Sequence, residues 1–198
     1  LTPEQRNDPY RAARMGSFKS FSDGSLGSRS AKLYTDYADD PGNTGILVIS
    51  PEDLAKRMYK AYRHGLQPAT HCIGDKALEV TLDAVEYCLE QGLKDGMTPE
   101  EQAKRLPFRI IHAQMATPEL IERMKKLPIV LDIQPTFLMT DLHWIEERVG
   151  KERAVLSYPW KTYLDAGLIM AGGSDAPVES FNPWIGIYAT VTRQDMDG

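Results

Sequence analysis

The sequence is poor in the features that mark several large classes of protein. Its only two cysteines, Cys72 and Cys88, follow neither a disulfide framework nor a metal-knuckle spacing, so we expect a reducing compartment and predict the cytoplasm. No run of Lys or Arg offers a surface to nucleic acid. No segment reaches the roughly 20 apolar residues that span a bilayer. These absences favour a small molecule as the partner, rather than nucleic acid or a membrane.

The composition is that of a globular protein. Hydrophobic residues make up 42% and charged residues 26% of the 198 positions, and the formal net charge is -5. This length can bury a sizeable core, so we predict one domain over residues 1–198. The chain opens on Leu1 rather than Met and ends at Gly198 soon after a segment that looks helical. We therefore expect a fragment of a longer protein.

Four Ser/Thr-Pro-Glu triplets predict helix starts. Each combines an N-cap hydroxyl, a proline suited to the first helical position and an acid favoured by the helix dipole. The triplets begin at Thr2, Ser50, Thr98 and Thr117. Apolar spacing and glycine stops predict helices over 51–64, ended by Gly65, over 75–91, ended by Gly92, and over 118–126, 160–166 and 183–193.

Apolar segments between these helices predict five strands, over 16–22, 67–72, 108–113, 128–134 and 168–172. Strands that alternate with helices at intervals of roughly 25 to 45 residues indicate a parallel sheet. Five strands do not close an eight-stranded barrel, so we predict an α/β fold that forms part of a (β/α)8 TIM-type barrel, roughly its strands four to eight. We expect an irregular stretch after 134, and a long loop over 24–45 that is either functional or mobile.

Four apolar runs each end in a residue that could bind metal or accept a proton: Lys19, His71, His112 and Asp175. Because parallel strands of a barrel present their carboxyl ends to one rim, we expect these side chains to converge there. Imidazole nitrogen and carboxylate oxygen suit zinc. An unmodified lysine ammonium would repel a cation, so Lys19 can be a ligand only when it is carboxylated or otherwise neutral.

Four motifs together resemble the amidohydrolase superfamily, and within it they look most like the N-substituted formamide deformylases and their relatives. They are the stretch from Phe18 to Arg29, His71-Cys72-Ile73-Gly74-Asp75, Arg109 to Gln114, and Gly173 to Val178. The resemblance covers nearly the whole chain. It implies a metal-dependent hydrolase that cleaves carbon-nitrogen bonds of non-peptide amides with a metal-activated water. The implied cofactor is a divalent metal, with zinc expected and one or two ions in the complete enzyme.

The resemblance also implies roles for the four residues. Lys19 matches a lysine at the end of the fourth barrel strand, which is carboxylated in many members and bridges two metals. His71 and His112 match the metal ligands after strands five and six. Asp175 matches the aspartate after strand eight, which is both a metal ligand and the catalytic general base.

The first two ligands of the family, a His-x-His pair after strand one, have no counterpart in this sequence. Only His64 and His143 remain among the four histidines, and they do not form that motif. We therefore expect one weakly held divalent ion or an empty site. The alternative hypothesis is a chain that folds and binds one metal or ligand but does not catalyse. Its unpaired first and last strands would also favour a homo-oligomer.

Plain structural interpretations remain open for the candidate site residues. A lone histidine in a strand, such as His71 or His112, is more often a hydrogen-bonded core residue than a ligand. Asp175 could be a turn residue, since Asp favours turns. Asp75 could equally be a helix cap or a functional residue.

Other polar residues have similar alternatives. Arg29 and Arg109 could bind a substrate or a carboxylate, and a structural salt bridge is favoured for Arg109. His64 should stabilise the end of its helix. His143, together with Asp141 and Trp144, could line the pocket.

Overall fold

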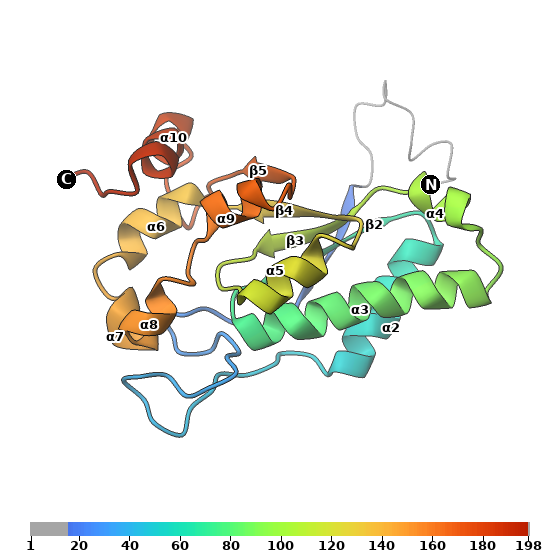
Figure 1. The fold of residues 1–198 in the computed structure, drawn as a ribbon, viewed down its shortest axis with the longest axis horizontal. Helices are drawn as coiled ribbons and strands as arrows, with labels where there is room; N and C mark the ends of the chain where they lie inside the picture. Colours follow the sequence, from blue (N-terminus) through green and yellow to red (C-terminus); the bar gives the residue numbers. More distant parts are fainter. Residues whose placement is uncertain (1–15, 198) are drawn as a thin grey trace.

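The computed structural model describes residues 16–197, in which parallel strands alternate with helices (Figure 1). The helix start expected at Thr2 lies outside this range. The sheet has the order β1-β2-β3-β4-β5 and every neighbouring pair is parallel. Its strands are β1 (Ser17–Phe21), β2 (Gln67–Cys72), β3 (Phe108–His112), β4 (Ile129–Ile133) and β5 (Met170–Gly172). The five expected strands and the α/β class are confirmed, with most strands shorter at their ends than expected.

Helices begin where the proline triplets predict. The hydroxyl of Ser50 accepts a hydrogen bond from the Asp53 amide, and those of Thr98 and Thr117 cap their helices in the same way. These satisfy amides that would otherwise lack a partner in the first turn. The helices are α2 (Pro51–Arg63), α4 (Pro99–Ala103) and α5 (Pro118–Met124); α3 (Asp75–Lys94), α9 (Trp160–Asp165) and α10 (Pro183–Thr192) also match expected helices.

Two expectations about helices were wrong. Helix α3 does not end at Gly92 but continues to Lys94, because the glycine with left-handed backbone that ends it is Gly96, with a φ of +92°. The stretch after β4 is not irregular but holds three short helices. They are α6 (Pro135–Asp141), α7 (Ile145–Val149) and α8 (Lys151–Ala154).

The register gives the sheet two different faces. Thr70, Ile110 and Leu131 share one face, which is buried under α2, α3 and α5 as part of the main apolar core. The opposite face carries a row that runs across the sheet and includes Phe21, His71, Ile111, Asp132 and Ala171. Phe21 is half exposed, so this second face is open at its β1 edge.

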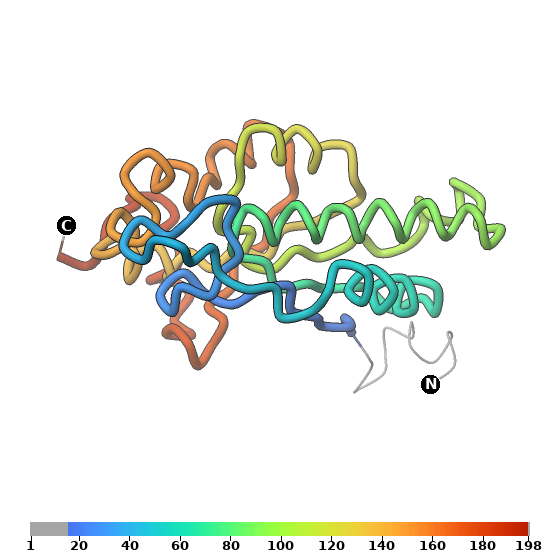
Figure 2. The backbone as a smooth tube through the Cα atoms, turned by 90° about the horizontal axis from the view of Figure 1, so that it is seen from below, coloured from blue at the N-terminus to red at the C-terminus, as the bar shows by residue number. Residues whose placement is uncertain are grey.

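The loop over 24–45 has a core of its own. Leu26, Leu33 and Tyr37 are fully buried, and they pack with Ile145 and Val149 of α7 in a second apolar cluster. Figures 1 and 2 both show this loop beside α7 and α8. The loop is therefore a packed, ordered segment at the carboxyl ends of the strands. Across the described residues, none of the helices is long and apolar enough to cross a membrane.

Candidate active site

His71 lies at the end of β2, and its ring is held by the loop that follows β1. Its Nε2 lies 2.9 Å from the carbonyl oxygen of Gly24. Because a carbonyl can only accept, Nε2 carries the proton and Nδ1 keeps its lone pair. Burial lowers the pKa of His71 below its ordinary value. The ring is therefore neutral at neutral pH and can bind a cation through Nδ1.

His112 ends β3 with a backbone conformation that few residues adopt. Regular alternation would place it on the face covered by helices, in register with Cys72. Its φ is +76° and that of Ala113 is +45°, and its ring lies 4.5 Å from the ring of His71, centroid to centroid. Left-handed backbone breaks the alternation and accompanies the pairing of the two imidazoles.

The electrostatics of His112 also favour a neutral ring. Burial, assisted by the neighbouring His71, lowers its pKa to about 3. Its Nδ1 is buried without a hydrogen-bond partner. The other ring nitrogen, Nε2, faces the Asp175 carboxylate and is the candidate ligand atom.

Asp175 follows β5 and brings a carboxylate to the same place. Its Oδ2 lies 4.0 Å from Nε2 of His112, and its backbone is also left-handed, with a φ of +55°. Its side chain is 42% exposed, so the carboxylate can meet solvent and a ligand from solvent.

Lys19 approaches the cluster from β1. Its Nζ lies 4.9 Å above the ring of Phe21, which in turn lies 5.0 Å from the ring of His71. Partial burial lowers the pKa of Lys19, while Asp175 and Asp132 oppose this shift. The structure thus brings together the four residues that the sequence singled out, and their roles as ligands stay a prediction.

The fit to a metal ion is partial. Two neutral imidazoles and a carboxylate are suitable donors for a divalent ion. Within residues 16–197, however, no group of three or more His, Cys, Asp or Glu side chains is arranged closely enough to hold one. Lys19 would have to lose its charge to contribute. The described residues therefore offer part of a metal centre.

Several other polar residues have structural partners. Arg29 forms two hydrogen bonds with Asp39, and Arg109 forms two with Asp132 at 2.7 and 2.6 Å, so both arginines neutralise a carboxylate. The salt bridge expected for Arg109 is confirmed.

The remaining histidines lie elsewhere. His64 is the C-cap residue of α2, and its expected stabilisation of the helix end stays a prediction. His143 is largely exposed and lies 3.1 Å from Asp195, beside a hollow lined by Thr140 and Glu179. It therefore lies outside the His71–His112 cluster.

Sequence reasoning missed the importance of Asp23 and the true position of Asp75. Gly74, not Asp75, is the N-cap of α3. The Asp75 carboxylate instead accepts hydrogen bonds from the amides of Tyr34 and Lys76. Asp23 is fully buried at the end of β1. The only signal in the sequence was its place inside the Phe18–Arg29 motif.

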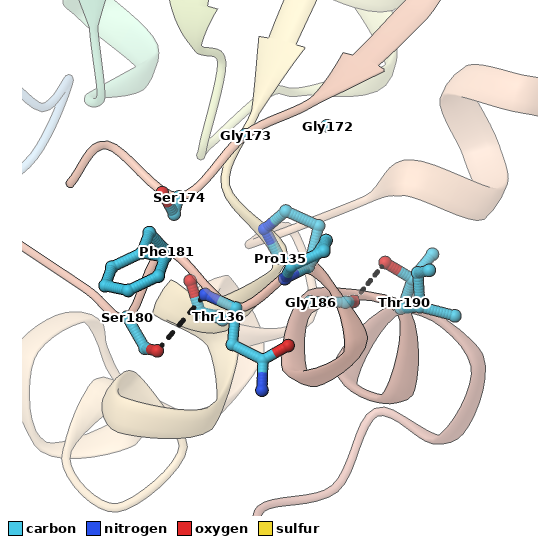
Figure 3. A pocket seen from close by; sticks show the side chains of 12 residues that line it. Pro135, Thr136, Gly172, Gly173, Ser174, Ser180, Phe181, Gly186 and Thr190 are labelled. Carbon is cyan, nitrogen blue, oxygen red and sulfur yellow. Dashed lines mark hydrogen bonds between the residues drawn. The ribbon is translucent and has the colours of Figure 1, made fainter.

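A cavity of about 330 Å³ opens beyond the carboxyl ends of β4 and β5, between α6 and α10 (Figure 3). Pro135, Phe181 and Ile187 give it apolar walls, and Ser174 connects it with the segment that carries Asp175. The hydroxyl of Thr136 is buried there without a hydrogen-bond partner. Ligands of open α/β sheets bind outside the carboxyl ends of the strands, which is where this cavity lies.

These features define the class of the protein: an α/β fold with a parallel sheet and a polar cluster at the carboxyl ends of its strands. Residues 2–198 match the model of the amidohydrolase family. The chain belongs to this family.

Individual relatives agree with this assignment. The chain is 40% identical over 192 residues to YtcJ of Bacillus subtilis (strain 168), named as an amidohydrolase, covering 96% of this chain and 34% of YtcJ. It is 39% identical over 181 residues to Protein LONG AFTER FAR-RED 3 of Arabidopsis thaliana, covering 90% of this chain and 29% of that protein.

Solved structures give the same picture. An uncharacterized metal-dependent hydrolase from Pyrococcus horikoshii shares 37% identity at a TM-score of 0.76, covering 90% of this chain and 35% of that one. A second, from Pyrococcus furiosus, shares 34% identity at the same TM-score, covering 90% and 36%. The chain thus spans about a third of the length of the relatives it matches.

Proposed function

We propose that the chain belongs to a metal-dependent hydrolase that cleaves carbon-nitrogen bonds of non-peptide amides, with formamide-type amides as the first substrates to test. The observation that carries this proposal is the convergence of His71, His112 and Asp175 at the carboxyl ends of three parallel strands. The family and the neighbouring metal-dependent hydrolases support it. In the complete protein the five strands would be strands four to eight of a barrel.

Each residue of the cluster has a role in the proposed mechanism that follows from its chemistry. His71 and His112, both neutral, would hold a divalent ion, for which zinc is the proposed identity, and Lys19 would join them if carboxylated. Such an ion would lower the pKa of a bound water to about 7 and polarise the amide carbonyl. Asp175 is exposed enough to reach water and would accept its proton. An apolar substituent of the amide would bind in the cavity beside Ser174.

We also propose a partner, a compartment and an oligomeric state for the protein. The partner is a small amide in the cytoplasm rather than nucleic acid or a membrane, and the chain associates with copies of itself. The alternative, a chain that binds one metal or ligand without catalysis, is favoured by one observation: within the described residues no three acidic, histidine or cysteine side chains form a complete metal site.

The test is an assay of the full-length protein against a panel of N-formyl and N-acyl amines, with metal content measured for each variant. Asp175→Asn should keep the metal and lower kcat by roughly 10² to 10⁴, because a positioned proton acceptor is lost. His71→Ala and His112→Ala should lose metal as well as activity. Unchanged turnover in Asp175→Asn, or activity that survives chelation, would contradict the mechanism. Bound metal without turnover would favour the alternative.

A further inference from the structure

Asp23 is a fully buried carboxylate that the proposed mechanism does not use. It follows β1 and its side chain has no exposed surface. Burying a carboxylate is costly unless hydrogen bonds or charges compensate, and burial raises the pKa of Asp23 to about 6. The groups that contact Asp23 should therefore compensate the free-energy cost of burying its carboxylate.

Three backbone amides donate to this carboxylate. The Lys32 amide lies 2.9 Å and the Gly74 amide 2.8 Å from Oδ2, and the Ile73 amide lies 3.1 Å from Oδ1. Lys32 belongs to the loop over 24–45, while Ile73 and Gly74 form the turn after His71. Asp23 thus ties the loop over 24–45 to the turn that follows β2.

The same carboxylate faces the His71 ring itself. Its Oδ1 lies 3.6 Å from Nε2, the nitrogen that is also 2.9 Å from the carbonyl oxygen of Gly24. Gly24 is the next residue in the chain, so the position of its carbonyl depends on how Asp23 is anchored. The Nε2 proton is thus donated to the Gly24 carbonyl, and the Asp23 carboxylate acts on it electrostatically from 3.6 Å.

We infer that Asp23 is a positioning residue for His71, which it holds in the tautomer and orientation that point Nδ1 toward the cation. This inference rests on the proposed function. A histidine that binds metal through one nitrogen usually donates the proton of the other to a carbonyl or carboxylate, and loss of that outer partner weakens metal binding. Here the carbonyl of Gly24 and the carboxylate of Asp23 act on the same proton.

Asp75 provides a matched control for a purely structural role. It is also a buried carboxylate, and it also ties the loop to the start of α3, through the amides of Tyr34 and Lys76. Its hydrogen bonds do not include His71. Replacing either aspartate with asparagine should weaken the anchoring of the loop over 24–45. Only the replacement of Asp23 should also change the orientation of the His71 ring.

The experiment titrates Co²⁺ into the metal-free, full-length protein and follows its visible absorption spectrum. Asp23→Asn should weaken Co²⁺ binding about 10- to 100-fold and shift the spectrum, because the ligand nitrogen is no longer held in place. Asp75→Asn should bind Co²⁺ as the wild type does, even where its unfolding midpoint falls. Equal losses of affinity in the two variants would overturn the inference.

Two further measurements keep the inference distinct from the proposed function. If the wild type binds no Co²⁺, or His71→Ala binds it equally well, the metal site itself is refuted and the inference with it. If Asp23→Asn does not fold, long-range ¹H–¹⁵N spectra of the histidine-labelled, metal-free wild type decide, with His71 assigned through His71→Gln. A proton on Nε2 shows that His71 has the tautomer that the inference requires, whereas a proton on Nδ1 overturns the inference.

Discussion

At the scale of single residues, three of the six non-glycine residues with positive φ within residues 16–197 lie at the candidate site. His112, Ala113 and Asp175 all have left-handed backbone, although none is glycine. Such conformations cost of order 1–3 kcal/mol each and persist only where the surrounding structure imposes them. Ala113 is fully buried in the main core. Strain at two candidate ligands is what a preorganised site would show.

A different residue-scale constraint acts at Gly74. A Cβ at this position would lie 2.0 Å from the carbonyl oxygen of Lys32, so the loop over 24–45 and the start of α3 can touch only because Gly74 has no side chain. Gly74→Ala should destabilise the protein by about 1–3 kcal/mol, the scale of overpacking in a filled site. The free energy of unfolding in urea measures this effect.

Gly27→Ala is the matched control. Gly27 lies in the same loop, and a Cβ there would meet the Trp144 ring at an ordinary 3.7 Å. Its cost should stay well below that of Gly74→Ala. Equal free energies of unfolding in the two variants would show that the loop moves away from Gly74 at little cost.

The sequence predicted the residues of the candidate cluster better than their surroundings. Lys19, His71, His112 and Asp175 could be found because each follows an apolar run, and ends of parallel strands share one edge. The left-handed backbone of His112 could not be found, since nothing local distinguishes this histidine from a regular strand residue. The hydrogen-bond partners of Asp23 could not be predicted from the sequence either, because two of them lie about 50 positions away in the chain.

At the scale of secondary structure, the helices that could be predicted are those with local signals in the sequence. Helices with a hydroxyl cap and proline were found at their starts. Helices α7 and α8 were missed because they are only five and four residues long, too short to show a helical spacing of apolar residues, and no hydroxyl or proline marks their starts. The end of α3 was misplaced because the sequence offers two glycines, Gly92 and Gly96, and only Gly96 adopts the left-handed backbone that ends the helix.

A buried polar network joins three elements behind the candidate site. The amide of Gln114, after β3, donates to the Asp141 carboxylate of α6 at 2.9 Å and to the Tyr158 hydroxyl at 2.6 Å. Tyr158, just before α9, donates its hydroxyl proton to the same carboxylate. Burial raises the pKa of Asp141 to about 6.

This network predicts a pH dependence of stability. Asp141 has an ordinary pKa of 3.8 and a folded pKa of about 6, so the folded protein holds the extra proton between these values. Its contribution to stability is therefore complete below about pH 4 and is lost as the pH rises through about 6. Asp141→Asn should remove this loss and gain about 1–3 kcal/mol relative to the wild type between about pH 4 and 7.

Urea unfolding of both proteins at several pH values measures the difference. Asp165→Asn, at an exposed carboxylate in α9, reports the effect of removing one surface charge. A constant offset between wild type and Asp141→Asn across this pH range would contradict the prediction.

At the scale of the whole molecule, the sheet is covered on one face and open along part of the other. Helices α2, α3 and α5 bury one face, while Lys19 and Phe21 remain accessible on the other. Among the described strands, β1 and β5 each pair on one side only, which leaves edge groups free to pair with another chain. Such edges favour association.

Helix α10 adds an apolar surface close to the β5 edge. Phe181 and Trp184 are 85% and 73% exposed, and Ile187 is half exposed. Large apolar side chains exposed close together in the chain often mark a surface that binds another molecule. Val155, on the α8 side of the molecule, is 76% exposed but stands apart from this group in the chain. It therefore provides a control position.

The last prediction follows from these two features: the 198-residue chain should self-associate. Sedimentation equilibrium at micromolar concentrations should give an average mass above the 22.2 kDa of the monomer, and the mass should rise with concentration. Trp184→Lys should move the average mass toward the monomer, because a charge on α10 must be desolvated when the apolar surface is buried. Val155→Lys should leave it unchanged. A single 22.2 kDa species at all concentrations would contradict this prediction, because the sheet edges and α10 would then remain exposed to solvent.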